Sequence, residues 1–218
     1  MIVEKVICLK KWGQWFFLSI GFVLFVAFSD FFGTWDRSID AQQAGIAEIK
    51  SSQDINGNGI DDAHDLVLGA RAYVKSQPRY GSRYYAGGYP DDGYGVCTDV
   101  VVAAFDEAGY CLKDLIDEDI ALNPSLYGIT VPDCNIDFRR VNNQQTFLER
   151  HALSLTIECS DPADWQPGDI VIYPQHIGIV SDRRNQQGYP YLIHFDSWGA
   201  RERDELANQT IVAHYRWP

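Results

Sequence analysis

The spacing of apolar residues changes once along this chain, and that change most constrains the fold. Between residues 65 and 153, apolar side chains recur at the spacing of amphipathic helices, over 65–75, 97–109, 112–122 and 144–153. After the turn at Pro167-Gly168 the pattern becomes extended, with strand-like runs over 169–173, 176–181, 191–195 and 211–217. Helices followed by an antiparallel meander predict an α+β domain.

The first 35 residues carry a different signal. Residues 12–29 hold no charged side chain, and a helix of that length, at about 1.5 Å per residue, reaches roughly 27 Å, close to the thickness of a hydrocarbon core. Lysines precede this run and aspartates follow it, so the positive-inside rule leaves the N-terminus in the cytoplasm. We expect residues 1–35 to be a cytoplasmic tip and single-pass membrane anchor. A cleaved signal peptide, which would leave a secreted or periplasmic protein, is the alternative.

The exported part begins with a predicted stalk over residues 36–64, whose first half reads as a short polar helix. The formal net charge of the chain is −12 at pH 7. That balance argues against nucleic acid as a partner, because no basic stripe is available to neutralise phosphates. Export permits disulfides, but the cysteine spacings show no framework, and the pairing of Cys111, Cys134 and Cys159 stays open.

Cys97 opens the second predicted helix, after a loop rich in Gly and Tyr. A helix N-terminus favours negative charge, so this placement predicts a thiol of lowered pKa; a small buried cysteine is the simpler explanation. His176 begins one strand-like run and His194 ends the next. If those strands pair through the turn near residues 185–188, both imidazoles project from one face of the sheet. With Cys97 they would then supply a nucleophile, a base and an orienting residue.

The order of these motifs resembles the NlpC-type cell-wall peptidases, which are papain-like cysteine hydrolases of bacteria. The motifs cover about residues 65–217: Tyr-x-x-Gly-Gly, the helix-opening Cys, Trp-x-Pro-Gly-Asp-Ile-Val, His-x-Gly-Ile-Val and Ile-His. The segments around Cys97, over 135–141 and at 214–216 are similar to an uncharacterised group of exported bacterial proteins within that clan. The resemblance therefore implies a papain-like domain over residues 65–218.

Carried over by position, the resemblance implies Cys97 as the nucleophile, His176 as the general base and His194 as the residue that orients the base. It also implies that Tyr84 or Tyr85 lies near the oxyanion, and the spacing fits both. The chain reads Val-Cys-Thr-Asp where these enzymes usually read Asp-Cys-Ser-Gly, which predicts a different pocket beside the nucleophile.

Charged residues near the nucleophile are candidates for substrate binding. Asp99, Arg139 and Arg140 would recognise charged peptide groups, since Arg pairs bidentately with carboxylates. The alternative is that the two arginines form structural ion pairs with Asp137 or with the acidic helix over 112–122.

A separate motif over residues 54–65 fits the twelve-residue calcium loop of EF-hands, and a helix follows it as the motif requires. The ligands would be Asp54, Asn56, Asn58, Ile60 (through its carbonyl), Asp62 and Asp65. The last position carries Asp in place of Glu, and the loop has no paired partner loop. The alternative is an acidic turn that caps the next helix, which explains the same residues.

These observations predict a membrane-anchored hydrolase of the bacterial cell envelope. It would cleave amide bonds with a Cys-His-His triad, without a cofactor for catalysis, and peptidoglycan stem peptides are the expected substrate. The membrane would be its second partner, through the N-terminal helix. The alternative is a catalytically idle domain of the same fold that binds cell-wall or protein ligands.

Overall fold

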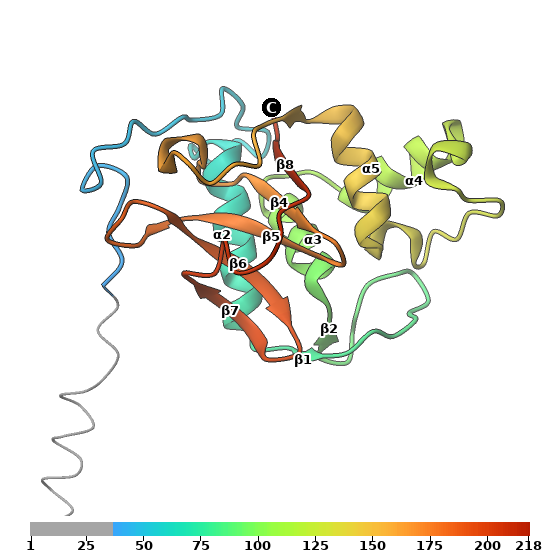
Figure 1. Cartoon of the computed structure of the whole chain (residues 1–218). Helices are drawn as coiled ribbons and strands as arrows, with labels where there is room; N and C mark the ends of the chain where they lie inside the picture. Colours follow the sequence, from blue (N-terminus) through green and yellow to red (C-terminus); the bar gives the residue numbers. More distant parts are fainter. Residues whose placement is uncertain (1–36) are drawn as a thin grey trace, which may run out of the picture. The chain divides into compact units, whose positions relative to one another are not determined.

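The structure, a computed structural model, describes residues 37–218, so the predicted membrane anchor at residues 12–29 lies outside it (Figure 1). Within the described range, no helix combines the length and the apolar character needed to cross a membrane. Residues 38–218 form one compact unit.

Two helices pack together beneath the sheet. They are α2 (Asp62–Lys75) and α3 (Cys97–Glu107), and they lie side by side in Figure 1. Their apolar faces are fully buried, and Gly69 allows the close approach, since a Cβ there would lie 2.4 Å from the carbonyl oxygen of Ala103. Strands β5 and β6 contact both helices. The nucleophile candidate therefore begins a helix that is fixed on two sides.

The sheet has six strands in the order β3-β8-β4-β5-β6-β7, and every neighbouring pair is antiparallel. The bounds are β3 (Leu153–Ser154), β4 (Ile170–Tyr173), β5 (His176–Arg184), β6 (Pro190–Asp196), β7 (Gly199–Arg203) and β8 (Ala213–Arg216). The strands β4 to β6 form a consecutive meander, as the sequence predicts, β7 adds a further strand to it, and the last strand returns to pair with β4. The α+β fold class is thereby confirmed.

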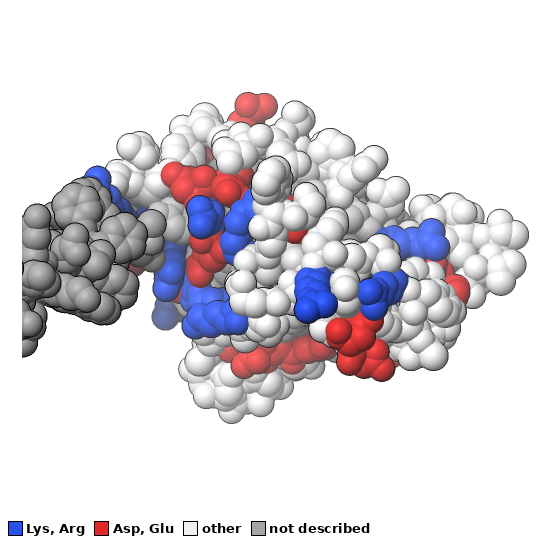
Figure 2. All heavy atoms as spheres, turned by 90° about the horizontal axis from the view of Figure 1, so that it is seen from below, with Lys and Arg blue, Asp and Glu red and all other residues white. Residues whose placement is uncertain are grey.

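Smaller elements surround this frame. The helices α4 (Leu112–Leu122) and α5 (Val141–His151) contact each other. The short helices η1 (Pro124–Tyr127) and η2 (Asp137–Arg139) each contact both of them. A further short helix, η3 (Pro162–Asp164), precedes β4. The strands β1 (Arg79–Tyr80) and β2 (Tyr94–Gly95) pair in parallel and close the loop that precedes α3. On the face seen in Figure 2, basic and acidic side chains are interspersed.

The prediction of a stalk helix is wrong for residues 37–61, the part of the stalk that the structure describes before α2. Residues 37–61 contain no helix; instead they make a turn over 41–45 and follow the surface of the domain. Ile39 exchanges backbone hydrogen bonds with Arg184. The guanidinium of Arg184 is fully buried and donates to the carbonyls of Pro162, Trp165 and Gly188. This segment is held by partners distant in sequence, which its own composition does not reveal.

Candidate active site

Cys97 is the first residue of α3, and its side chain is only 5 % exposed. The helix begins there because Val96 is extended and its backbone N–H donates to the carboxylate of Asp99 at 2.8 Å. The backbone N–H of Ile177 in β5 also reaches the sulfur. The nucleophile candidate thus lies where the start of α3 meets the strand that His176 opens.

The ionisation of Cys97 differs from the expectation based on the helix N-terminus. Burial raises the pKa of the thiol to about 11, although the backbone N–H groups of Ile177, Thr98 and Cys97 favour the thiolate. Desolvation outweighs the helix-terminal amides, so the thiol is protonated at neutral pH. Any reaction of Cys97 therefore needs a base that takes its proton.

The two histidines lie on one face of the sheet, as the strand register dictates. Gly178 pairs with His194 across β5 and β6, which places His176 diagonally opposite. Nε2 of His176 lies 2.8 Å from Nδ1 of His194, and Nε2 of His194 lies 2.8 Å from a carboxylate oxygen of Glu205. Both rings are almost fully buried. The expected contact between the two imidazoles is therefore present, with Glu205 as a further member.

The order of these hydrogen bonds determines the tautomers. A carboxylate only accepts, so His194 donates to Glu205 through Nε2 and, when neutral, accepts at Nδ1. His176 must then donate from Nε2, which leaves its Nδ1 as a lone pair. Nδ1 of His176 is thus the basic nitrogen of the histidine–histidine–glutamate cluster.

Burial keeps both imidazoles neutral. Burial, together with the neighbouring His194, lowers the pKa of His176 to about 4. Burial also lowers the pKa of His194, although Glu205 opposes that effect. Arg201 donates to both Asp196 and Glu205 and so fixes the carboxylate that holds His194. A protonated thiol and a neutral base are therefore the resting state of the cluster.

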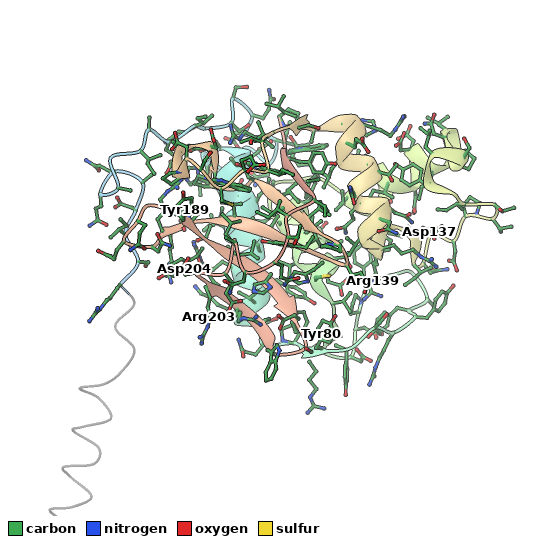
Figure 3. The ribbon with its side chains drawn as sticks, in the orientation of Figure 1. Tyr80, Asp137, Arg139, Tyr189, Arg203 and Asp204 are labelled. Carbon is green, nitrogen blue, oxygen red and sulfur yellow. The ribbon has the colours of Figure 1, made fainter. Side chains whose placement is uncertain are left out.

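Glu205 was missed by sequence reasoning, because it lies in a loop after β7 with no recognisable motif. Tyr80, in the two-residue strand β1, was also missed, because no recognisable motif marks it. Burial and the adjacent Cys97 raise the pKa of Tyr80, whose ring lies 5.3 Å from that of Phe195. Figure 3 shows Tyr80 beside the turn that joins β6 and β7. Tyr80 is thus a tyrosine next to the sulfur.

Tyr84 and Tyr85, expected near the oxyanion, have other partners. The hydroxyl of Tyr84 donates to Asp133 at 3.1 Å, and that of Tyr85 donates to Asp92 at 2.8 Å. Gly87 and Gly88, which follow them, have φ near +90°, and this conformation turns the loop away after the tyrosines.

The three charged candidates for substrate binding divide into two groups. Asp99 and Arg139 are both 5 % exposed and form a bidentate pair at 2.7 and 2.9 Å. Arg140 is exposed and lies 3.5 Å from Asp137. Both arginines therefore form structural ion pairs, as the alternative interpretation of the sequence proposed. The partner of Arg139 is Asp99, however, which that interpretation did not name. Figure 3 shows Asp137 and Arg139 near one end of α5.

The backbone of the loop over residues 54–65 has features of the EF-hand calcium-binding motif. Gly59, at the sixth position, has φ +87°, and the carboxylate of Asp54 accepts the N–H groups of Asn58 and Gly59. Asp65 is fully buried and accepts from the amides of Asn56 and Asn58. Among residues 37–218, no three His, Cys, Asp or Glu side chains gather closely enough to hold a metal ion. A calcium ion here would therefore require amide and carbonyl oxygens as well, and its binding stays a prediction.

The cysteines of the described part are all unpaired. Cys111 and Cys134 are exposed, whereas Cys159 is half-buried. The bridge that the sequence left open among these three is thus not formed in this structure.

These features define the class: an α+β protein in which a buried cysteine opens a helix that packs against the antiparallel sheet, and that sheet carries a histidine–histidine–glutamate cluster. The chain belongs to a family described as "Domain of unknown function (DUF1287)", whose model matches residues 67–217. It is 38 % identical over 165 residues to the "Uncharacterized protein YijF" of Escherichia coli (strain K12). That alignment covers 70 % of this chain and 80 % of the relative. No solved structure matches the chain.

Proposed function

We propose that this protein is a cysteine hydrolase that cleaves amide bonds. One observation carries the proposal: the hydrogen-bonded series from Glu205 through His194 to His176, which opens the strand whose next residue, Ile177, reaches the sulfur of Cys97 through its backbone N–H. A cysteine, a neutral base and a group that orients the base are the parts that nucleophilic catalysis requires. Their burial and their order within the fold are hard to explain as core packing alone.

The geometry supports a general-base mechanism. Nδ1 of His176 takes the thiol proton as the sulfur of Cys97 attacks the carbonyl carbon of the substrate. The first N–H groups of a helix have no intrahelical acceptor, so that of Cys97 can stabilise the developing oxyanion. His176 then gives the proton to the leaving amine, which departs and leaves a thioester. Water, deprotonated by the same nitrogen, releases the acid and restores the thiol.

Peptidoglycan stem peptides are the proposed substrate, and the bacterial cell envelope is the proposed location. Support comes from the resemblance to the NlpC-type peptidases and from the uncharged segment at residues 12–29. The packing of the Cys97 helix against a sheet that carries His176 also supports a papain-like fold. Two aromatic side chains offer contact surface: Tyr80 is 45 % exposed, and Trp198, two residues after the end of β6, is 89 % exposed.

The test is direct. Purified full-length protein is incubated with peptidoglycan sacculi, and the released fragments are identified by mass spectrometry. We expect peptide products from the wild type and a loss of at least about 10³-fold in Cys97→Ala, because catalytic groups act as one unit. Cys111→Ala, which alters an exposed thiol, is the matched control and should keep full activity. Undiminished release by Cys97→Ala would remove Cys97 from the mechanism.

The rival, a binding domain without catalysis, gives a different result in the same assay. Such a domain would sediment with the sacculi and release nothing, and Cys97→Ala would bind as the wild type does. The observation that favours it is the high pKa of Cys97, because a buried neutral thiol is also what an inert cysteine shows.

A further inference from the structure

His214 is a buried histidine that the proposed mechanism does not use. It lies in β8 and is 1 % exposed. Its Nδ1 lies 2.8 Å from the backbone carbonyl oxygen of Thr156, and its Nε2 lies 2.9 Å from a carboxylate oxygen of Asp169. The ring therefore joins the segment that follows β3 to the residue that precedes β4.

Both neighbours of the ring are hydrogen-bond acceptors. A carbonyl oxygen and an ionised carboxylate have no proton to donate, so each contact needs an N–H on the ring. Neutral imidazole has one N–H, whereas imidazolium has two. Turning the ring over would point C–H groups at both oxygens. The geometry therefore requires His214 to carry two protons, in contrast to His194, which lies between an acceptor and a donor.

The carboxylate of Asp169 is ionised, because its partners donate to it. Arg216 donates at 2.7 and 2.8 Å, and the backbone N–H of Gln166 donates at 2.8 Å. Together with His214, these contacts occupy the four acceptor sites of a carboxylate. Asp169 is fully buried, and a buried carboxylate needs cations and hydrogen bonds to compensate its charge.

The charged groups around the ring act in both directions. Asp169 contacts the ring and favours its positive charge, whereas Arg216, which binds the same carboxylate, opposes it. The charge of Arg184, on β5, also acts on Asp169. The ring of His214 is stacked on that of Trp165, with the centroids 4.1 Å apart and the planes 9° from parallel. An indole face attracts a cation, more strongly where water is excluded.

The hydrogen bond to the carbonyl of Thr156 fastens an exposed segment. Residues 156–158 are all exposed. Beside them, the backbone N–H of Leu155 donates to the carbonyl of His214 at 2.9 Å, a bond that does not depend on the protonation of the ring. Segments with few buried contacts open at a low cost in free energy. The bond from the ring is thus a tether on a part of the chain that would otherwise open readily.

We propose that His214 is a pH-sensitive lock: as an imidazolium it fastens residues 155–160 to the sheet, and the loss of one proton releases them. The neutral ring keeps its N–H toward Asp169, the charged acceptor, and turns the lone pair of Nδ1 toward the carbonyl of Thr156. That contact becomes repulsive, and water replaces the carbonyl as the partner of the ring. Nothing in this inference depends on hydrolysis by Cys97.

The direction of the pH dependence follows from the two hydrogen bonds. Histidine in an unfolded chain titrates near pH 6.5. Because the folded state needs the second proton for both contacts of His214, it holds that proton more tightly than the unfolded chain does. The stabilisation is therefore present below about pH 6.5 and is lost as the pH rises above it.

The test measures ring protonation and segment opening in the full chain. NMR of ¹⁵N-labelled histidine distinguishes a protonated ring nitrogen from a bare one. Hydrogen exchange followed by mass spectrometry, corrected for the intrinsic effect of pH, measures the protection of residues 155–160. We expect both nitrogens of His214 to be protonated at pH 6. Protection of the segment should fall at least about tenfold between pH 6 and pH 9, as one nitrogen loses its proton.

Two variants should move this transition in opposite directions. Asp169→Asn removes the negative charge and should lower the pH of the transition by at least about one unit, whereas Arg216→Gln removes an opposing cation and should raise it. His151→Gln alters an exposed histidine on α5 and should leave the transition unchanged. If Asp169→Asn does not fold, the wild type and Arg216→Gln still decide.

Three results would overturn the inference. The first is a ring nitrogen of His214 that is already bare at pH 6. The second is protection of residues 155–160 that stays constant while a nitrogen loses its proton. The third is the same transition pH in Arg216→Gln as in the wild type.

Discussion

Burial moves the pKa values of Cys97 and His176 in opposite directions, upward for the thiol and downward for the imidazole. Both groups are therefore neutral over the physiological range, and proton transfer has to accompany attack. Catalysis by such a pair depends more on the position of the base than on its charge. The residues that position it, His194 and Glu205, become the sharpest place to test the mechanism.

Glu205 fixes the tautomer of His194, and we predict that Glu205→Ala lowers kcat by about 10- to 100-fold with little change in KM. Without the carboxylate, His194 is free to carry its proton on Nδ1, and His176 then loses its acceptor. The kinetic constants of peptide release measure the effect, and ¹⁵N shifts of the imidazoles report the tautomers. Glu205→Gln, whose carbonyl oxygen can still accept, should retain more activity than Glu205→Ala.

Asp204, the neighbouring carboxylate, hydrogen-bonds Asn185 and lies away from the histidines, so Asp204→Ala is the control. Figure 3 shows Asp204 beside Arg203. If Glu205→Ala kept wild-type kcat and wild-type imidazole shifts, the positioning role of Glu205 would be wrong.

At the scale of elements, β5 and β6 place the two rings together, and Gly178 makes that possible. A Cβ at Gly178 would lie 3.0 Å from the carbonyl oxygen of Ile193 and 3.1 Å from Cβ of His194. We predict that Gly178→Ala displaces His194 and costs at least about tenfold in kcat, because small misplacements of catalytic groups are expensive.

The same variant should remain folded, with a loss of about 1–3 kcal/mol in the free energy of unfolding from overpacking. Peptide release and urea denaturation measure the two effects separately. Wild-type activity in Gly178→Ala would mean that the His176–His194 pair tolerates the displacement of His194. The glycine would then matter only for the backbone of β5.

The loop over residues 54–65 is the element on which the calcium prediction depends. A ligand that binds only the folded state raises its stability by mass action. We predict a higher Tm in millimolar calcium than in chelator, and the same Tm in magnesium as in chelator. Because chain entropy and loop packing also change in variants, the calcium-dependent difference within each protein is the quantity to compare.

Asp54→Ala combined with Asp65→Ala should abolish that difference, whereas Asp91→Ala, on the loop before α3, should preserve it. Hydrolysis at low temperature should change little on chelation, since the loop is remote from Cys97 in the sequence. Equal Tm values with calcium and chelator in the wild type would leave the segment as an acidic turn that leads into α2.

The helices and the meander could be predicted because their apolar periodicity is local. Leu112–Leu122 matches α4 at both ends, and α2 begins three residues before the predicted Asp65. The strand β7 was not predicted, because Gly199–Arg203 carries charged residues and only one buried side chain. The site was predicted in part: the two histidines follow from strand alternation, whereas Glu205 and Tyr80 reach the cluster through tertiary contacts that no sequence period encodes.

For the whole molecule, the buried histidines make stability depend on pH. His176 has a folded pKa of about 4 against 6.5 for the exposed side chain, and the pKa of His194 is lowered as well. Because the unfolded chain binds protons more readily, the stabilising contribution is complete above pH 6.5 and is lost as the pH falls toward 4. We predict that the free energy of unfolding decreases over this window by on the order of 1–3 kcal/mol.

Carboxylates make the stability depend on pH in a lower pH range. Arg150 and Tyr127 hold the pKa of Asp119 near 2 despite partial burial, so its stabilising contribution is lost only below its ordinary pKa of 3.8. Urea denaturation at half-unit pH steps separates the two windows. His176→Asn, whose side-chain amide can still donate to His194, should flatten the slope between pH 6.5 and 4 and leave the acidic limb unchanged. A wild-type stability that stayed constant or rose as the pH fell from 6.5 to 4.5 would show that the imidazoles are not held neutral by burial.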